Sequence, residues 1–225
     1  MKHRFSLAIL LCSFAQISNA ATVVSYSFAG YNQNSSTSPP TYQASGVNAG
    51  NFYRSGALGR DMNLGGFTAT RWPANANTLK PLNTSYYFGF TIDEDVGITI
   101  SLTQISFGST TSGNGIREFA LRSSLDGFTQ NIAMRAQSND GNTHLQLLGL
   151  DSRFSNLTDP VTFRLYGYEA LSDMGGWSIS DLKVSGDVVP EPSASILTAI
   201  AGILFLTYRT RKSKCGISHA TSSPK

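Results

Sequence analysis

The chain has 225 residues, of which 40% are hydrophobic, 11% aromatic and 14% charged, and its formal net charge is +3. The basic excess belongs to the two ends, because residues 22–189 contain 10 basic and 13 acidic residues, a net charge of −3. Such a body has no basic stripe that could neutralise phosphates, which argues against a nucleic-acid partner. Its length is sufficient for one core of ordinary size, so we expect a single folded domain.

Residues 1–20 have the layout of a secretory signal peptide. Lys2 and Arg4 form a basic start, residues 5–14 are apolar, and small residues stand at Ser18 and Ala20. This order predicts cleavage after Ala20 and export of the mature chain.

The cysteines agree with an exported body. Cys12 lies in the predicted signal peptide and Cys215 lies close to the C-terminus. The region between them contains no cysteine, so no disulfide framework can form there and the core must hold the domain together.

Residues 22–188 are expected to form an all-β domain. Residues 98–107 alternate apolar and polar side chains, which places Ile98, Ile100 and Leu102 on one face of a strand. Turn signals separate the runs of β-branched and aromatic residues. Eight or more short strands favour a two-sheet antiparallel sandwich of the jelly-roll type, with a closed barrel as the alternative. The predicted strands cover residues 23–28, 86–92, 98–107, 119–123, 132–136, 144–150, 161–168 and 177–184.

Residues 29–81 predict a long, loop-rich face with one short strand at 67–71. Glycine, asparagine, serine, threonine and proline dominate this region, but it also contains large apolar residues such as Phe52, Leu58 and Trp72. These residues argue against a disordered linker. Trp72 is the candidate ligand contact, because an exposed indole could stack on a sugar ring. The alternative is that Trp72 anchors the loops in the core.

The body offers little catalytic chemistry, and we expect no enzyme activity. Its single histidine, His144, falls in a predicted strand and is interpreted as a surface or edge residue. Asp93 and Asp95 have the spacing of a carboxylate pair on one strand face, but with Glu94 they are better explained as a solvated turn. No cofactor is expected, although Asp93, Glu94, Asp95, Asp140 and Asn142 could offer oxygen ligands to calcium.

Residues 189–214 combine a proline-acid motif, an apolar stretch and a basic cluster. The motif, residues 189–193, contains Val189, Pro190, Glu191 and Pro192, and the uncharged stretch at 193–208 follows it. Sixteen helical residues reach roughly 24 Å, which approaches the ~30 Å hydrocarbon core of a membrane. The positive-inside rule then keeps the basic cluster and the tail at 215–225 in the cytoplasm and leaves the motif outside the membrane. The cluster at 209–214 contains Arg209, Arg211, Lys212 and Lys214.

This order of motif, span and basic cluster resembles the PEP-CTERM sorting signal of bacterial proteins that are processed by exosortase. The resemblance implies exosortase as a partner and an inner-membrane anchor before processing. It also implies a final location at the cell surface or outside the cell. An ordinary anchor helix that is never processed is the alternative.

Two further stretches resemble the closing half of concanavalin-like or carbohydrate-binding-module sandwiches. They are residues 122–128 and residues 163–186, and the second ends in the pattern Trp-x-Ile-x-Asp-Leu-x-Val-x-Gly from Trp177 to Gly186. The resemblance implies a jelly roll, and sugar binding only faintly.

The sequence therefore predicts an exported, exosortase-sorted surface or extracellular-matrix protein with a non-enzymatic β-sandwich. Its expected association is with exopolysaccharide or biofilm. The alternative is a carbohydrate-binding module or a glycan-degrading enzyme.

Overall fold

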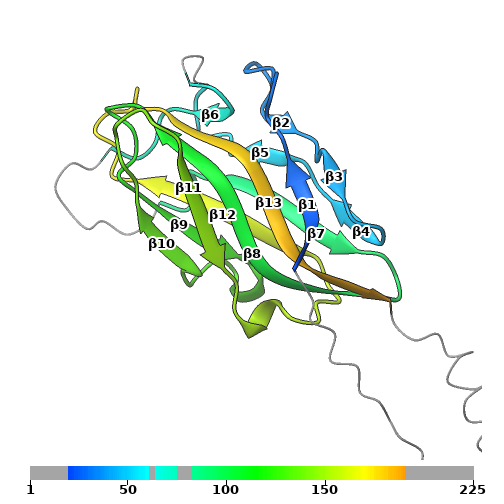
Figure 1. The fold of residues 1–225 in the computed structure, drawn as a ribbon. Helices are drawn as coiled ribbons and strands as arrows, with labels where there is room; N and C mark the ends of the chain where they lie inside the picture. The colour runs from blue at the N-terminus through cyan, green and yellow to red at the C-terminus, as the bar shows by residue number, and fades with distance from the viewer. Residues whose placement is uncertain (1–19, 61–63, 75–82, 191–225) are drawn as a thin grey trace, which may run out of the picture.

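The prediction of an all-β sandwich is confirmed. The computed structural model describes residues 20–60, 64–74 and 83–190, and these ranges form two antiparallel sheets that lie face to face (Figure 1). Two 3₁₀ turns, η1 (Ser124–Asp126) and η2 (Ser152–Phe154), are the helical segments of these ranges. No helix in them has the length and apolar character required to cross a membrane. Residues 1–19 of the predicted signal peptide and the predicted span at 193–208 lie outside the described residues.

The first sheet is built around the last strand, β13. One side of β13 pairs with β8, and the other side pairs with β6 and then with β1. β11 and β3 form the two edges. The strands of this sheet are β1 (Ala21–Tyr26), β3 (Tyr42–Gln43), β6 (Phe67–Ala69), β8 (Ile98–Thr111), β11 (His144–Gly149) and β13 (Trp177–Pro190).

The second sheet has the strand order β10-β9-β12-β7-β5-β2, and β4 also pairs with β7. The chain crosses from one sheet to the other at most of its connections, which is the connectivity of a jelly roll. The strands of this sheet are β2 (Thr37–Ser38), β4 (Val47–Ala49), β5 (Phe52–Arg54), β7 (Phe88–Glu94), β9 (Glu118–Ser123), β10 (Ala133–Ala136) and β12 (Val161–Tyr168).

The loop-rich face predicted at 29–81 contains more strands than expected. The predicted strand at 67–71 is present as β6, and β2, β3, β4 and β5 add four pieces of two or three residues each. Phe52, Leu58 and Phe67 are buried. The interpretation of this region as part of the folded domain, and not a disordered linker, is therefore confirmed.

β8 does not keep the simple alternation that its sequence predicts. Ile100 and Leu102 enter the core as expected, but the next buried apolar residues are Ile105 and Phe107. The register with β13 shifts at this point, opposite Gly186. A Cβ atom on Gly186 would lie 2.0 Å from the carbonyl oxygen of Ser101, so the two backbones approach this closely because residue 186 is glycine.

The core between the sheets is strongly aromatic. The ring of Phe88 lies 5.1 Å from that of Trp72 and 5.2 Å from that of Trp177, and the two indoles are themselves 5.1 Å apart. Gly167 makes room for them, since a Cβ there would lie 2.9 Å from Trp72 and 3.1 Å from Trp177. Trp177 donates its indole N–H to the Ser109 hydroxyl at 2.8 Å, so its buried polar atom is satisfied.

Replacing Trp72 with alanine should lower the free energy of unfolding by about 3–5 kcal/mol, because it removes a buried indole from between two rings. Chemical denaturation of the wild type and Trp72→Ala measures this difference.

The matched control is Tyr42→Ala, which removes an aromatic ring that is 50% exposed and should change the free energy of unfolding by no more than about 0.5 kcal/mol. Equal effects of the two substitutions would contradict a structural role for Trp72.

Candidate functional site

The prediction that Trp72 contacts a ligand is wrong. Its side chain is 1% exposed, and its indole N–H donates to the carbonyl of Ala69 at 2.9 Å. A stacking platform for a sugar must present its ring to solvent, and this ring faces Phe88 and Trp177 inside the sandwich. Trp72 is a loop anchor, which was the alternative interpretation. Trp177 is also a core residue.

His144 lies where the sequence predicts it, on an edge strand. β11 ends the first sheet, and the Asp140 carboxylate accepts a hydrogen bond from the His144 ring at 3.0 Å. Hydrogen bonds from His144 and from the backbone N–H of Asn142 lower the pKa of Asp140 to about 2. Both side chains are well exposed, and together they fasten the turn before β11.

The acidic residues between β7 and β8 also serve the local backbone. Asp93 and Glu94 end β7, and the turn itself starts at Asp95. An Asp93 oxygen accepts the Glu94 N–H at 3.0 Å, and an Asp95 oxygen accepts from the Asn48 amide at 2.7 Å. Neither these residues nor Asp140 join a group of three histidine, cysteine, aspartate or glutamate side chains within the described ranges.

The first two residues of the predicted sorting motif belong to the last strand of the sandwich. Val189 and Pro190 are the last residues of β13, where they pair with Thr99 and Ile98 of β8. Glu191 and Pro192 lie outside the described residues, as do the predicted topology residues Arg209, Arg211, Lys212 and Lys214.

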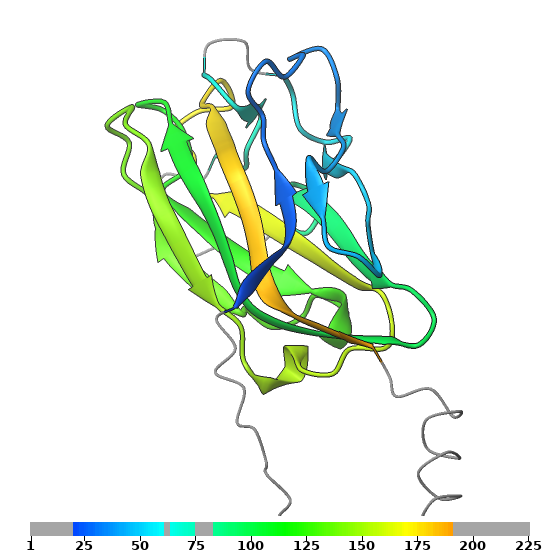
Figure 2. The same ribbon diagram turned by 45° about the vertical axis from the view of Figure 1, so that its right-hand side comes forward.

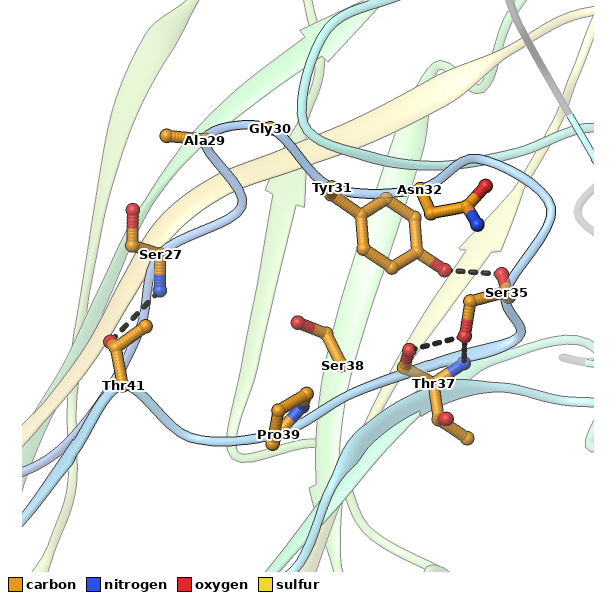
Figure 3. Close-up of a pocket in the computed structure, with 10 residues that line it drawn as sticks. All are labelled: Ser27, Ala29, Gly30, Tyr31, Asn32, Ser35, Thr37, Ser38, Pro39 and Thr41. Atoms are coloured by element: carbon orange, nitrogen blue, oxygen red, sulfur yellow. Dashed lines mark hydrogen bonds between the residues drawn. The ribbon is translucent and has the colours of Figure 1, made fainter.

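A pocket of about 350 Å³ opens in the loop after β1 (Figure 3). The Tyr31 ring forms one wall, and the Tyr31 hydroxyl donates to the Ser35 carbonyl. The hydroxyls around it mostly bind the loop itself: Ser35 donates to the Thr37 carbonyl at 2.6 Å, and Thr41 accepts the Ser27 N–H at 3.1 Å. These groups hold the shape of the loop, and few of them are left to bind a ligand.

The outer face of the second sheet carries a more distinctive group of side chains, which we call the Tyr–Arg face. The strand pairing places these residues together, because Arg164 lies opposite both Arg122 and Gly89, and Tyr53 lies opposite Gly89 from the other side. The neighbouring positions along each strand point into the core. The Tyr–Arg face consists of Tyr53, Tyr87, Arg122, Phe128, Arg164 and Tyr166.

Arg164 is the centre of the Tyr–Arg face. Its guanidinium carbon lies 3.8 Å from the centroid of the Phe128 ring and 4.3 Å from that of the Tyr87 ring. The Tyr87 ring in turn lies 5.6 Å from the Tyr166 ring and 6.0 Å from the Tyr53 ring. Both rings lie within the distance at which cation–π attraction holds an arginine.

Arg122 fixes the loop that supplies Phe128. Its Nε donates to the Asn131 side chain at 2.7 Å, and its Nη1 donates to the Phe128 carbonyl at 2.8 Å. Phe128 has a φ of 62°, a left-handed conformation that is unusual for a bulky residue and costs of order 1–3 kcal/mol. The loop is therefore held in a strained shape that keeps the Phe128 ring over Arg164.

Three buried polar atoms in the described residues have no hydrogen-bond partner, and all belong to the outer side of the second sheet. They are the Tyr166 hydroxyl, Arg164 Nε and Glu118 Oε2. Tyr166 is fully buried, although its neighbours on this face are half-buried. Buried polar groups are nearly always paired in folded proteins, so three unpaired groups on one face of a sheet call for an explanation.

The sequence interpretation missed the Tyr–Arg face. A signal was present, because the alternation of β12 places Thr162, Arg164, Tyr166 and Tyr168 on the side opposite the core residues. The pairing of Arg164 with Arg122 and the position of Phe128 depend on register and on a left-handed backbone, and neither can be read from the chain alone.

No family model matches the chain. No curated protein matches its sequence either.

Several solved structures resemble the chain at low similarity. A xylan-binding module is 11% identical, with 66% of this chain and 94% of that chain covered and a TM-score of 0.37. An adhesin domain of Lys-gingipain from Porphyromonas gingivalis is 11% identical, with 72% and 97% covered and a TM-score of 0.37. An acetyl xylan esterase from Butyrivibrio proteoclasticus is 12% identical, with 76% and 35% covered and a TM-score of 0.37. The ligands and activities named for these proteins are properties of those proteins.

The pair of Asp140 and His144 predicts a specific pH dependence of stability. The pKa of Asp140 is about 2 in the folded chain, below the value of about 3.9 of an unfolded aspartate. Its contribution to stability is therefore complete above about pH 4 and is lost as the pH falls from about 4 to 2. Asp140→Asn should make the thermal unfolding midpoint fall less steeply across this interval.

The control for this measurement is Asp173→Asn, since Asp173 is exposed and its side chain has no hydrogen bond within the described residues. Parallel pH profiles for the wild type and Asp140→Asn would contradict the assignment.

Proposed function

We propose that the chain is an exported, exosortase-sorted surface or extracellular-matrix protein whose non-enzymatic β-sandwich is associated with exopolysaccharide. The observation that supports this proposal is the position of the two ends of the sandwich. The predicted signal peptide and the predicted sorting signal join the domain at one end, and the pocket in the loop after β1 lies at the other end.

The first and last strands place the ends together. Ala21, where β1 begins, pairs with Gly186 of β13, and Pro190 follows four residues later on the same strand. β1 runs away from this end, and the loop that follows it lies at the opposite end of the domain from the two chain ends (Figure 2). An anchor at 193–208 would hold the domain with its loops turned away from the membrane.

The absence of enzyme activity is part of the proposal. His144 is engaged with Asp140 on an edge strand, Asp93 accepts the backbone N–H of Glu94, and Asp95 accepts from the Asn48 side chain of β4. These placements favour structural roles for the histidine and the aspartates, which are the residue types that most often act as general acids or bases.

Carbohydrate binding by the sandwich itself is the second candidate function. The tyrosine rings of the Tyr–Arg face favour it, because aromatic rings at a sheet surface offer apolar planes next to polar groups. This role is compatible with the first, since a matrix protein must contact the matrix.

The sorting proposal predicts that Glu191→Ala combined with Pro192→Ala keeps the protein in the membrane fraction at its unprocessed size. The motif would no longer be accepted by exosortase, whereas Pro190 remains to complete the pairing of β13 with Ile98. Immunoblots of membrane, surface and medium fractions measure the change.

Val96→Ala is the matched control, because Val96 is a fully exposed apolar residue in the turn that leads to Ile98, next to the end of β13. It should be processed like the wild type. A double variant with wild-type size and surface location would refute exosortase sorting.

A further inference from the structure

We propose that the Tyr–Arg face binds a carboxylate-bearing polysaccharide, with Arg164 and Arg122 holding a uronate carboxylate and the tyrosine rings contacting the sugars. This inference deepens the proposed function and rests on it, since it names the class of exopolysaccharide that the sandwich contacts.

The first argument is the pairing of two like charges. Arg122 and Arg164 are directly opposite on antiparallel strands and point to the same outer face. Side chains in such a pair start about 4.5–5.5 Å apart, and like charges there destabilise the sheet. An anion bound between the two guanidinium groups would remove this repulsion.

The second argument is that neither arginine has an acidic partner among the described residues. The ion pairs of the described residues join His144 with Asp140, and Arg153 with Asp126 and Asp151. Glu118 is on the same face but four residues along β9 from Arg122, about 13 Å away at ~3.3 Å per residue. The positive charge of this face is therefore not neutralised by a neighbouring carboxylate.

The third argument is the way in which Arg164 is held. The centroids of the Phe128 and Tyr87 rings lie 3.8 and 4.3 Å from its guanidinium carbon, and the N–H groups of a guanidinium lie in its plane. The two rings restrict the guanidinium, and its terminal nitrogens are the groups that a carboxylate would contact. Arg122 is also fixed, through Nε and Nη1, and its Nη2 has no hydrogen bond with any described residue.

The Tyr166 hydroxyl supplies an independent observation. It is buried and unpartnered, as is the neighbouring Nε of Arg164. The hydroxyl lies close enough to the guanidinium to affect its pKa: burial lowers the pKa of Arg164, but Tyr166, Tyr87 and Tyr53 together raise it above its usual value. Both atoms are inaccessible to solvent, so a ligand oxygen would have to displace the side chains that cover them; once there, it would satisfy groups that the folded chain leaves without partners.

The tyrosines identify the occupant as a saccharide. Tyr53 leans across Gly89, and a Cβ atom at residue 89 would lie 2.8 Å from its ring, so the ring rests on the sheet because residue 89 is glycine. Tyr53 and Tyr87 border the arginines with half-buried aromatic surface. Sugar rings pack on such surfaces. Because the body has a net charge of −3 and does not attract a polyanion by its overall charge, binding of a uronate polymer would depend on the local pair of arginines.

The test compares two forms of one polymer. Calorimetric titration of the full chain in detergent micelles with de-esterified polygalacturonate should show binding, and its methyl ester, which has the same sugar rings without the charge, should bind at least tenfold more weakly. Raising the salt concentration from 50 to 500 mM should weaken binding to the polygalacturonate and leave the ester unaffected.

Two substitutions probe the arginine. Arg164→Gln should weaken polygalacturonate binding at least tenfold, and Arg164→Lys should weaken it about fivefold, because lysine keeps the charge but loses the planar fork. Arg135→Gln is the matched control: it removes an exposed charge from β10 of the same sheet and should change the affinity less than twofold. Circular dichroism and thermal unfolding confirm that each variant is folded.

The outcomes separate the two proposals. Equal binding of the acid and the ester, equal loss in Arg135→Gln and Arg164→Gln, or tighter binding of dextran sulfate would overturn the uronate assignment and leave an association with polysaccharide standing. Binding of neither polygalacturonate form would overturn the assignment, and failure with a panel of neutral polysaccharides as well would overturn the association itself.

Discussion

The antiparallel pairing of β13 with β8 is the interaction on which the rest of the sandwich depends. It runs from Trp177 opposite Thr111 to Pro190 opposite Ile98, and β1 and β6 then add to the free side of β13. The central strand of the first sheet is therefore the last strand of the domain to be synthesised. The sheet cannot form completely until this strand is available for pairing. Such long-range pairing carries a loop-closure cost, which an aromatic core must offset in a body without cysteines.

This topology also explains which parts of the fold the sequence could predict. Long strands such as β8, β12 and β13 carry enough residues for a two-residue period to be visible, and their first residues were predicted correctly, but β8 and β13 continue four and six residues beyond their predicted ends. β2 and β3 have two residues each, too few for any periodicity, and they exist because tertiary pairing with β5 and β1 holds them. The bulge opposite Gly186 was missed for a similar reason, since it is a property of two strands and not of one.

The candidate site was harder to predict because neighbours that are distant in sequence decide which side chains lie in the core and which lie on the outer face. Trp72 precedes a proline in a polar region, which suggests exposure, but Gly167 on the inner face of β12 leaves space for its indole. Arg164, three residues before that glycine, points outward and meets Phe128 and Arg122. The same strand thus admits an indole on one face and presents a guanidinium on the other, and only its register reveals this division.

The Tyr–Arg face is costly for the folded chain, and this cost is the strongest reason to assign it a ligand. A buried polar atom without a partner costs about 1–3 kcal/mol, and a bulky residue in the left-handed region costs a similar amount. Tyr166, Arg164 and Phe128 carry such costs within one small surface. Arg164 also lies opposite a second arginine, Arg122. A domain that is stable by only about 5–15 kcal/mol concentrates such costs at few places, and binding sites are the usual ones. A carboxylate bound at the guanidinium edges would offset the repulsion and the missing hydrogen bonds together, whereas a neutral ligand would offset only the hydrogen bonds.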